Sequence, residues 1–248
     1  MNRKASLLHY PRALCILLVI PVLTFLVSFI ALIGMFIFRV SSEKIQILPR
    51  LWGRIIVRGS GVKVSIRSAA ELDRATSYIY AANHQSQYDI FALQGYLTHD
   101  FRWLAKKELF SIPVFGTAMR KAGYISVDRS HGRKAVQSLV EAAQRIADGI
   151  SVIIFPEGTR SPDGKLQTFK AGVMVLAIRS GVPIVPVAIS GSHEVLPKGA
   201  LLPRPGHIRI IMGTPIETSD YTLKQKDELA ARLQQTVATL LEEAKRQG

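Results

Sequence analysis

The sequence predicts an α/β fold in which helices flank a mixed central sheet, with a hydrophobic helical membrane anchor at the N-terminus. Two observations predict it. From about residue 60 onward, short apolar or β-branched segments alternate with segments of helical periodicity. The apolar residues make up 48% of the 248-residue chain, and the first forty positions hold an outsized share of them. This length suits one sizeable core with appendages.

Residues 13–38 contain no charged side chain. As a helix they extend about 39 Å, against a hydrocarbon core of roughly 30 Å, so this segment is long enough to span or re-enter a bilayer. A cleaved signal peptide is the alternative, because Arg3, Lys4 and Arg12 resemble its basic region. The apolar run is too long for one, and no small-residue cleavage site follows it.

Residues 42–58 mix apolar and basic side chains in the pattern of an interfacial amphipathic helix. We therefore predict a membrane anchor over residues 1–58, made of a hydrophobic helix at 13–38 and an amphipathic helix at 42–58. A second domain follows over 59–248. More basic residues follow the apolar run than precede it, which favours a cytoplasmic location for that domain.

Beyond the anchor, alternating apolar and polar residues over 62–67 predict the first strand. Further strands are predicted at 77–82, 101–105, 124–127, 151–155, 184–189 and 207–212. Helices are predicted at 133–148, 171–179 and 223–246. Strands that alternate with helices predict the α/β class.

The charge balance is strongly basic, with 32 Lys and Arg against 18 Asp and Glu, which gives a formal charge of +14. This fits three kinds of anionic partner, namely nucleic acid, an anionic lipid surface or an acidic substrate. Cys15 is the one cysteine, so the chain forms neither an intrachain disulfide nor a cysteine-based metal site. A reducing location facing the cytoplasm agrees with that.

A polar cluster at residues 83–89 directly follows a predicted strand and contains His84 and Asp89. On one continuous helix these side chains would point about 140° apart, whereas a loop-to-helix junction brings them together. Asp89 would then fix the imidazole tautomer while the other ring nitrogen takes a proton from a hydroxyl. The alternative is a capping box, because Ser86 and Asp89 have its spacing.

A second cluster, residues 155–161, follows another predicted strand and pairs Gly158 with Arg160. Glycine permits close backbone approach and arginine suits bidentate phosphate contact, so this segment predicts an anion cradle. A local salt bridge between Glu157 and Arg160 is the alternative. A nucleotide-binding P-loop is excluded, because Leu166 stands where Ser or Thr must follow Lys165.

Taken together, these segments resemble the glycerolipid acyltransferase family, most closely its 1-acylglycerol-3-phosphate acyltransferase branch. Residues 83–89 match the family's His-x4-Asp block, and residues 123–129 resemble its second block. Residues 155–161 match the third block closely, and residues 182–187 resemble the fourth. The combination of the first and third blocks at this separation is the specific part of the resemblance.

The resemblance implies transfer of an acyl group from acyl-CoA or acyl-acyl carrier protein to the sn-2 hydroxyl of lysophosphatidic acid, giving phosphatidic acid. His84 would be the general base and Asp89 its support. The residues expected to hold the glycerol phosphate are Glu157, Gly158, Thr159, Arg160, Arg129 and one of Lys106 or Lys107. The end of the second block, Asp128-Arg129, departs from many relatives, which weakens the assignment of Arg129.

The same resemblance implies no metal and no tightly bound cofactor. The expected partners are the lipid bilayer, the acyl carrier and the lysolipid, and the expected location is the cytoplasmic face of a bacterial inner membrane. Other acceptors stay open, namely glycerol 3-phosphate, another lysophospholipid or lyso-ornithine lipid.

Two other classes of function fit less well. A serine hydrolase would need a Gly-x-Ser-x-Gly elbow, which the chain lacks. A basic, membrane-tethered binding domain would explain the charge but not the two polar clusters at strand ends. Nucleic acid is not expected as a partner, because the interleaved aromatic and basic residues of such sites are not seen.

Overall fold

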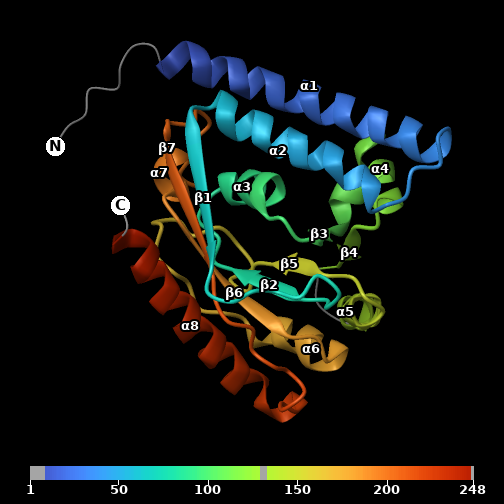
Figure 1. Ribbon diagram of the computed structural model, residues 1–248, viewed down its shortest axis with the longest axis vertical. Coiled ribbons are helices and arrows are strands. Elements are labelled where there is room, and N and C mark those ends of the chain that lie inside the picture. Colours follow the sequence, from blue (N-terminus) through green and yellow to red (C-terminus); the bar gives the residue numbers. More distant parts are fainter. Residues whose placement is uncertain (1–8, 129–132, 247–248) are drawn as a thin grey trace.

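A seven-stranded sheet forms the centre of the computed structural model, which describes residues 9–128 and 133–246 (Figure 1). The strand order across the sheet is β1-β7-β6-β2-β5-β3-β4. The strands are β1 Val62–Ser68, β2 Ile79–Ala82, β3 Arg102–Lys106, β4 Ile125–Val127, β5 Val152–Ile154, β6 Ile184–Ser190 and β7 Gly206–Met212. All seven predicted strand segments are confirmed, within a few residues at their ends.

The sheet is mixed, as predicted. Strands β6 and β7 pair antiparallel, whereas β1 with β7, β6 with β2, β2 with β5, β5 with β3 and β3 with β4 pair parallel. Strands β2 and β5 are neighbours in the register Ile79 to Val152. Their carboxyl ends therefore meet at the same edge of the sheet, which is where the loops of an α/β fold gather functional groups.

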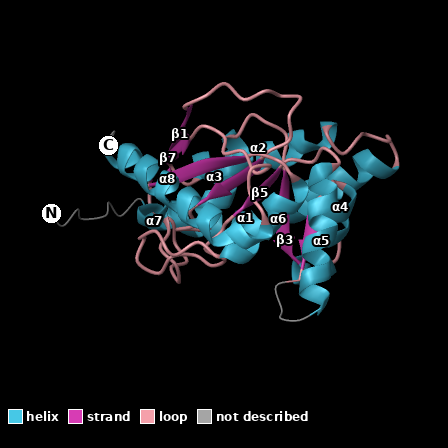
Figure 2. Ribbon diagram, turned by 90° about the horizontal axis from the view of Figure 1, so that it is seen from below, coloured by secondary structure: helices cyan, strands magenta, loops and turns pink. Residues whose placement is uncertain are grey.

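Helices cover both faces of this sheet (Figures 1 and 2). One layer holds α1 His9–Phe36, α2 Ile47–Gly59, α3 Tyr88–Tyr96 and α4 Phe115–Lys121, with the short turns η1 Lys44–Gln46 and η2 Lys107–Ser111. The other holds α5 Arg133–Ala147, α6 Ala171–Ser180 and α8 Lys226–Arg246, which follows η3 Leu223–Gln225. Helix α7, Ser192–Val195, lies against β7.

The three helices predicted after residue 130 are confirmed as α5, α6 and the η3–α8 segment. The elements η2, α4 and α7 were not predicted. Each has seven residues or fewer, which is too short for an apolar stripe to repeat at the helical period.

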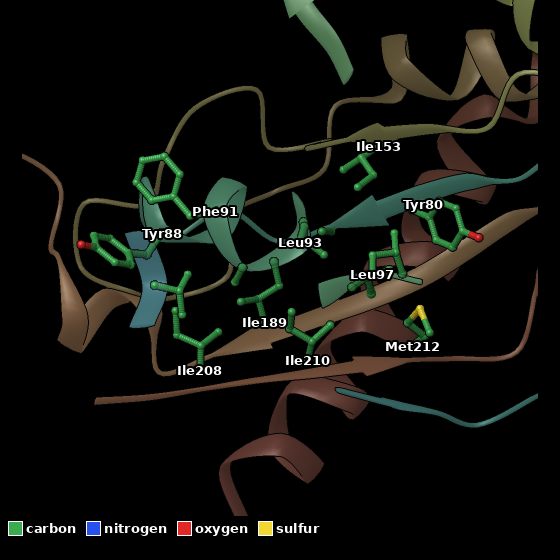
Figure 3. Close-up of a cluster of buried hydrophobic side chains, with 14 of the residues drawn as sticks. Tyr80, Tyr88, Phe91, Leu93, Leu97, Ile153, Ile189, Ile208, Ile210 and Met212 are labelled. Atoms are coloured by element: carbon green, nitrogen blue, oxygen red, sulfur yellow. The ribbon is translucent and has the colours of Figure 1, made fainter. Parts of the chain in front are cut away.

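The central strands are buried on both faces, which gives the fold two cores. Tyr80 and Ala82 of β2 point toward α3, whereas Ile79 and Ala81 point toward α5, α6 and α8. Figure 3 shows the first of these cores, where side chains of α3 lie over those of β6 and β7. Continuous burial along β2 and β6 explains why these strands are apolar at almost every position.

Two glycines let α2 and α3 approach closely. A Cβ atom on Gly53 would lie 2.7 Å from the carbonyl oxygen of Phe91 and 2.9 Å from the nitrogen of Gly95. The Arg54 side chain donates a hydrogen bond from Nε to the Gly95 carbonyl oxygen at 2.6 Å. Because α3 also carries Asp89, this contact helps to fix the position of one of the predicted catalytic residues.

Helix α1 lies along α2 and α4 and is long and apolar enough to cross a membrane. On its inner side the Trp52 indole donates to Thr24 Oγ1 at 3.0 Å, and Ala31 packs with Ile45 and Ala122. Its outer side exposes a stripe of large apolar side chains: Leu14, Leu18, Val22, Phe25, Leu26, Phe29 and Ile30. The division into an anchor over 1–58 and a domain over 59–248 stays a prediction.

We expect Gly53→Ala to lower the free energy of unfolding by about 1–3 kcal/mol, because the added methyl group meets backbone atoms that cannot move aside. Gly172→Ala in α6 is the matched control, since its Cβ would meet no atom within 4 Å. That change should raise stability by about 0.5–1 kcal/mol. Denaturation of the detergent-solubilised full chain measures both, and equal effects would contradict the close α2–α3 contact.

Candidate functional site

The two predicted polar clusters lie side by side at the carboxyl ends of β2 and β5. Residues 83–89 follow β2 and lead into α3, while residues 155–161 follow β5. The main-chain nitrogen of Ser161 donates to the carbonyl oxygen of His84 at 2.7 Å, so the two loops are bonded directly. Segments more than seventy residues apart in the sequence thus form one site.

His84 and Asp89 are in direct contact, with His84 Nδ1 2.8 Å from Asp89 Oδ2. The same oxygen accepts main-chain hydrogen bonds from Gln85 at 2.7 Å and Ser86 at 2.8 Å. Asp89 is fully buried, as the second residue of α3. The reciprocal capping box is incomplete, because Ser86 Oγ accepts from the main chain of Tyr88 and not from that of Asp89. The carboxylate that orders the loop also orients the imidazole.

A carboxylate accepts hydrogen bonds, so the contact with Asp89 assigns the proton to Nδ1 of His84 and leaves the lone pair on Nε2. The ring stacks on Phe155 with centroids 3.9 Å apart and planes 10° from parallel. Its side chain is 12% exposed. The imidazole is thus fixed in plane and tautomer, with Nε2 free of any protein partner among the residues described.

Glu157 supports the loop that carries His84 and does not line the cavity beside that histidine. Its Oε1 accepts the main-chain hydrogen bond of His84 at 2.8 Å, and its Oε2 accepts from Gln167 Nε2 at 2.9 Å. Burial raises the pKa of this carboxyl group, and the hydrogen bonds from His84 and Gln167 counter that rise. Within residues 9–128 and 133–246, Glu157 forms no salt bridge with Arg160.

The rest of the predicted anion cradle does face the cavity. Gly158, Thr159 and Arg160 line it together with His84. Gly158 has φ of 76°, and a Cβ there would lie 2.9 Å from Lys170 Nζ, so the turn requires glycine. The Arg160 guanidinium has no carboxylate partner in the described part of the chain, which leaves its donors for an anion.

The structure separates the two lysine candidates after β3. Lys106 is exposed, lines the same cavity and lies 3.6 Å from Glu108. Lys107 pairs instead with Asp128 at 2.7 Å, and this hydrogen bond raises the pKa of Lys107. Arg129 lies outside the described residues. Of the pair, Lys106 is therefore the one in position to meet a ligand beside His84.

Lys198 is a basic residue of this site that sequence reasoning missed. Its Nζ donates to the Arg160 carbonyl oxygen at 3.0 Å and lies 3.4 Å from Thr159 Oγ1. It belongs to the loop between α7 and β7. No local pattern marks Lys198, because the contact depends on how that loop folds back over the cradle.

The cavity beside His84 has a volume of about 540 Å³ and becomes apolar away from the polar cluster. It extends between α1, α2, α3, β3 and α4. Its apolar lining includes Ile20, Val27, Ala31, Ile45, Trp52, Ile90, Phe91, Leu104, Leu109, Phe115, Ala118 and Met119. The cavity thus has polar walls beside His84 and apolar walls farther away. No cluster of His, Cys, Asp and Glu suited to a metal ion occurs among the residues described.

Proteins of known family resemble this chain in sequence. Residues 63–190 match the acyltransferase family. A 1-acyl-sn-glycerol-3-phosphate acyltransferase of Limnanthes alba is 35% identical over 177 residues, covering 71% of this chain and 62% of that protein. Its Salmonella typhimurium counterpart is 33% identical over 185 residues, covering 73% and 75%. The chain therefore spans less than two thirds of the plant relative.

A solved structure agrees over nearly the whole chain. The 1-acyl-sn-glycerophosphate (LPA) acyltransferase PlsC from Thermotoga maritima is 28% identical with a TM-score of 0.73. The similarity covers 90% of this chain and 95% of that one. It extends beyond residues 63–190, so it includes at least part of the N-terminal helices.

We expect Glu157→Ala to lower the free energy of unfolding by about 1–3 kcal/mol, because it leaves the His84 and Gln167 donors unpaired in a buried place. Glu157→Gln keeps an acceptor there and should cost less. Glu217→Ala, at an exposed site, is the control. A loss no larger for Glu157→Ala than for Glu217→Ala in denaturation would refute the supporting role.

Proposed function

Because the chain belongs to the acyltransferase family, we propose that it transfers a fatty acyl group from a thioester to the sn-2 hydroxyl of 1-acyl-sn-glycerol 3-phosphate, giving phosphatidic acid. One observation carries the proposal: His84, which the buried Asp89 orients, lines a cavity that turns apolar together with Arg160, which has no carboxylate partner among the residues described. The names of the relatives support the acceptor. The thioester is acyl-CoA or acyl-acyl carrier protein.

In the proposed reaction, His84 Nε2 removes the proton of the acceptor hydroxyl as its oxygen attacks the thioester carbonyl carbon. The Asp89 carboxylate stabilises the imidazolium that forms, at the 2.8 Å contact with Nδ1. The tetrahedral intermediate then collapses, the carbon–sulfur bond breaks, and the thiolate takes the proton from the imidazolium. A C–O bond replaces a C–S bond, and no acyl-enzyme is formed.

We assign the acceptor phosphate to the cradle of Gly158, Thr159 and Arg160, with Lys106 and Lys198 beside it. An exposed main chain at the glycine and a guanidinium fork both suit phosphate oxygens. Glu157, expected earlier among the phosphate ligands, is assigned to positioning, because both of its oxygens are bonded to His84 and Gln167.

The apolar part of the cavity is assigned to a fatty acyl chain. Each methylene that leaves water for such a wall contributes roughly 0.8 kcal/mol, so a long chain gains much of its binding energy there. Ile20, Val27 and Ala31 of α1 form part of that wall. Such a chain would therefore lie between the N-terminal helix and the rest of the domain.

We further propose that the protein sits on the cytoplasmic face of a membrane with α1 in the plane of the bilayer. The outer stripe that includes Leu18, Phe25 and Phe29 is exposed, while Ala13, Ile16 and Ala31 on the inner side are buried. These buried positions are spread from Ala13 to Ala31, so a helix that crossed the bilayer would lose its contacts with the domain. An apolar face with basic residues nearby on α2 suits the interface.

Purified protein assayed with acyl-CoA, acyl-acyl carrier protein and a panel of acceptors tests the activity and its acceptor. We expect turnover with lysophosphatidic acid to exceed that with glycerol 3-phosphate, other lysophospholipids or lyso-ornithine lipid. His84→Ala should lose about 10²–10⁴-fold or more in rate, and Asp89→Asn should also be severely impaired. Both should still sediment with vesicles. Near-normal turnover of His84→Ala would remove the general base from the proposal.

Arg160→Ala should raise the KM for lysophosphatidic acid at least about tenfold, because a charge-assisted phosphate contact is lost. The KM for the acyl donor should change much less. Lys165→Ala is the matched control, since this nearby cation is exposed and does not line the cavity. Unchanged acceptor kinetics in Arg160→Ala would exclude that residue from the phosphate site.

A further inference from the structure

A second cavity, of about 720 Å³, lies at the opposite edge of the sheet from His84. Ser77 and Ser151, which precede β2 and β5, line it. His84 follows β2, so the two sites are separated by roughly 20 Å of extended chain, at about 3.3 Å per residue. The segment between α1 and α2 forms another wall. This cavity is thus distinct from the site that holds the proposed reaction.

The second cavity is strongly basic. Five of its lining residues are Lys or Arg, and two are Asp or Glu. The basic ones are Lys44, Arg50, Arg74, Arg102 and Arg145, and the acidic ones are Glu43 and Asp100. Cations gathered in one hollow raise the local concentration of anions there.

Arg102 and Arg145 form the inner part of this cluster. Arg102 is 5% exposed, and its Nη1 bonds Asp100 at 2.7 Å, which compensates its charge. Arg145 donates from Nη2 to the Gly123 carbonyl oxygen at 2.8 Å. Partial burial and the neighbouring Arg102 charge both lower the pKa of Arg145. The fold therefore places both guanidinium groups in the wall of one cavity.

Arg50 is held in the same way as Arg145. Its Nη2 donates to the carbonyl oxygens of Thr98 at 3.2 Å and His99 at 3.0 Å. Within residues 9–128 and 133–246, neither Arg50 nor Arg145 forms an ion pair with a carboxylate. Main-chain acceptors fix both groups in place but leave their charges uncompensated, and each guanidinium carries five donors.

We propose that this second cavity binds a phosphate-bearing anion, held by Arg50 and Arg145 with Lys44 and Arg74 at the rim. The planar fork of arginine matches phosphate oxygens in a bidentate way, and several cations suit a multiply charged group better than one carboxylate. The phosphate belongs either to a soluble molecule or to the head group of an anionic lipid.

Binding there would act on a wall that both cavities share. Gln46 lines the basic cavity and is 2% exposed; its Nε2 donates to the carbonyl oxygens of Ser42 at 3.0 Å and Ala122 at 3.2 Å. The adjacent Ile45, together with Ala122, lines the apolar cavity. An anion beside Arg50 would therefore stabilise the segment that closes the apolar cavity.

Pyrophosphate titrated into the full chain in detergent, followed by calorimetry, tests the proposal. The Arg160→Ala background weakens the cradle beside His84 as a competing site. We expect saturable binding that weakens at least about tenfold in Lys44→Glu/Arg74→Glu, because reversed charges at the rim repel the anion. Both residues are exposed, so this variant keeps the fold, and Arg145→Gln should weaken binding as well.

The control is Arg179→Glu/Lys224→Glu, which makes the same change of net charge at exposed positions that do not line the cavity. Equal loss in the control would mean diffuse attraction and would overturn the site. So would binding that the rim variant leaves unchanged.

A lipid arm compares phosphatidylcholine vesicles with and without phosphatidic acid, by hydrogen exchange over residues 42–50 and 145–151. Protection by phosphatidic acid that the rim variant loses, without pyrophosphate binding, supports a lipid head group. Pyrophosphate binding without that protection supports a soluble ligand. Neither response in the parent chain would overturn the proposal.

Discussion

The buried carboxylate of Asp89 is the group on which the candidate site depends. One of its oxygens accepts hydrogen bonds from His84 Nδ1 and from the main chain of Gln85 and Ser86. Those donors belong to the turn that ends β2 and begins α3. The same carboxylate accepts the main-chain hydrogen bonds of the turn and orients the imidazole. A substitution of Asp89 therefore changes both the local structure and the proposed chemistry.

Three further contacts hold the groups around that carboxylate in place. Glu157 accepts the main-chain hydrogen bond of His84. The parallel pairing of β2 with β5 brings the Phe155 ring against the imidazole. Helix α2 packs closely against α3 at Gly53. Each contact joins segments distant in the sequence, which is why a site built largely from loops is held so firmly.

Local periodicity was enough to predict the seven strands and the longer helices, because burial repeats every two residues in strands and every 3.6 in helices. The spacing allowed His84 to meet Asp89 across a loop-to-helix junction, but it left a helix cap open as the alternative. The orientation of Glu157 did not follow from spacing, since its partner Gln167 comes from another segment. Lys198 and the apolar cavity were missed for the same reason: both arise only where several elements pack together.

Helix α1 has two working faces. One offers Leu18, Phe25 and Phe29 to the surroundings, and the other places Ile20 and Ala31 in the wall of the apolar cavity. With α1 in the plane of a bilayer, as proposed, lateral pressure or a change in lipid packing would push on the first face and so move the second. The pocket volume, and with it the chain length that fits, would then depend on the mechanical state of the membrane as well as on the sequence.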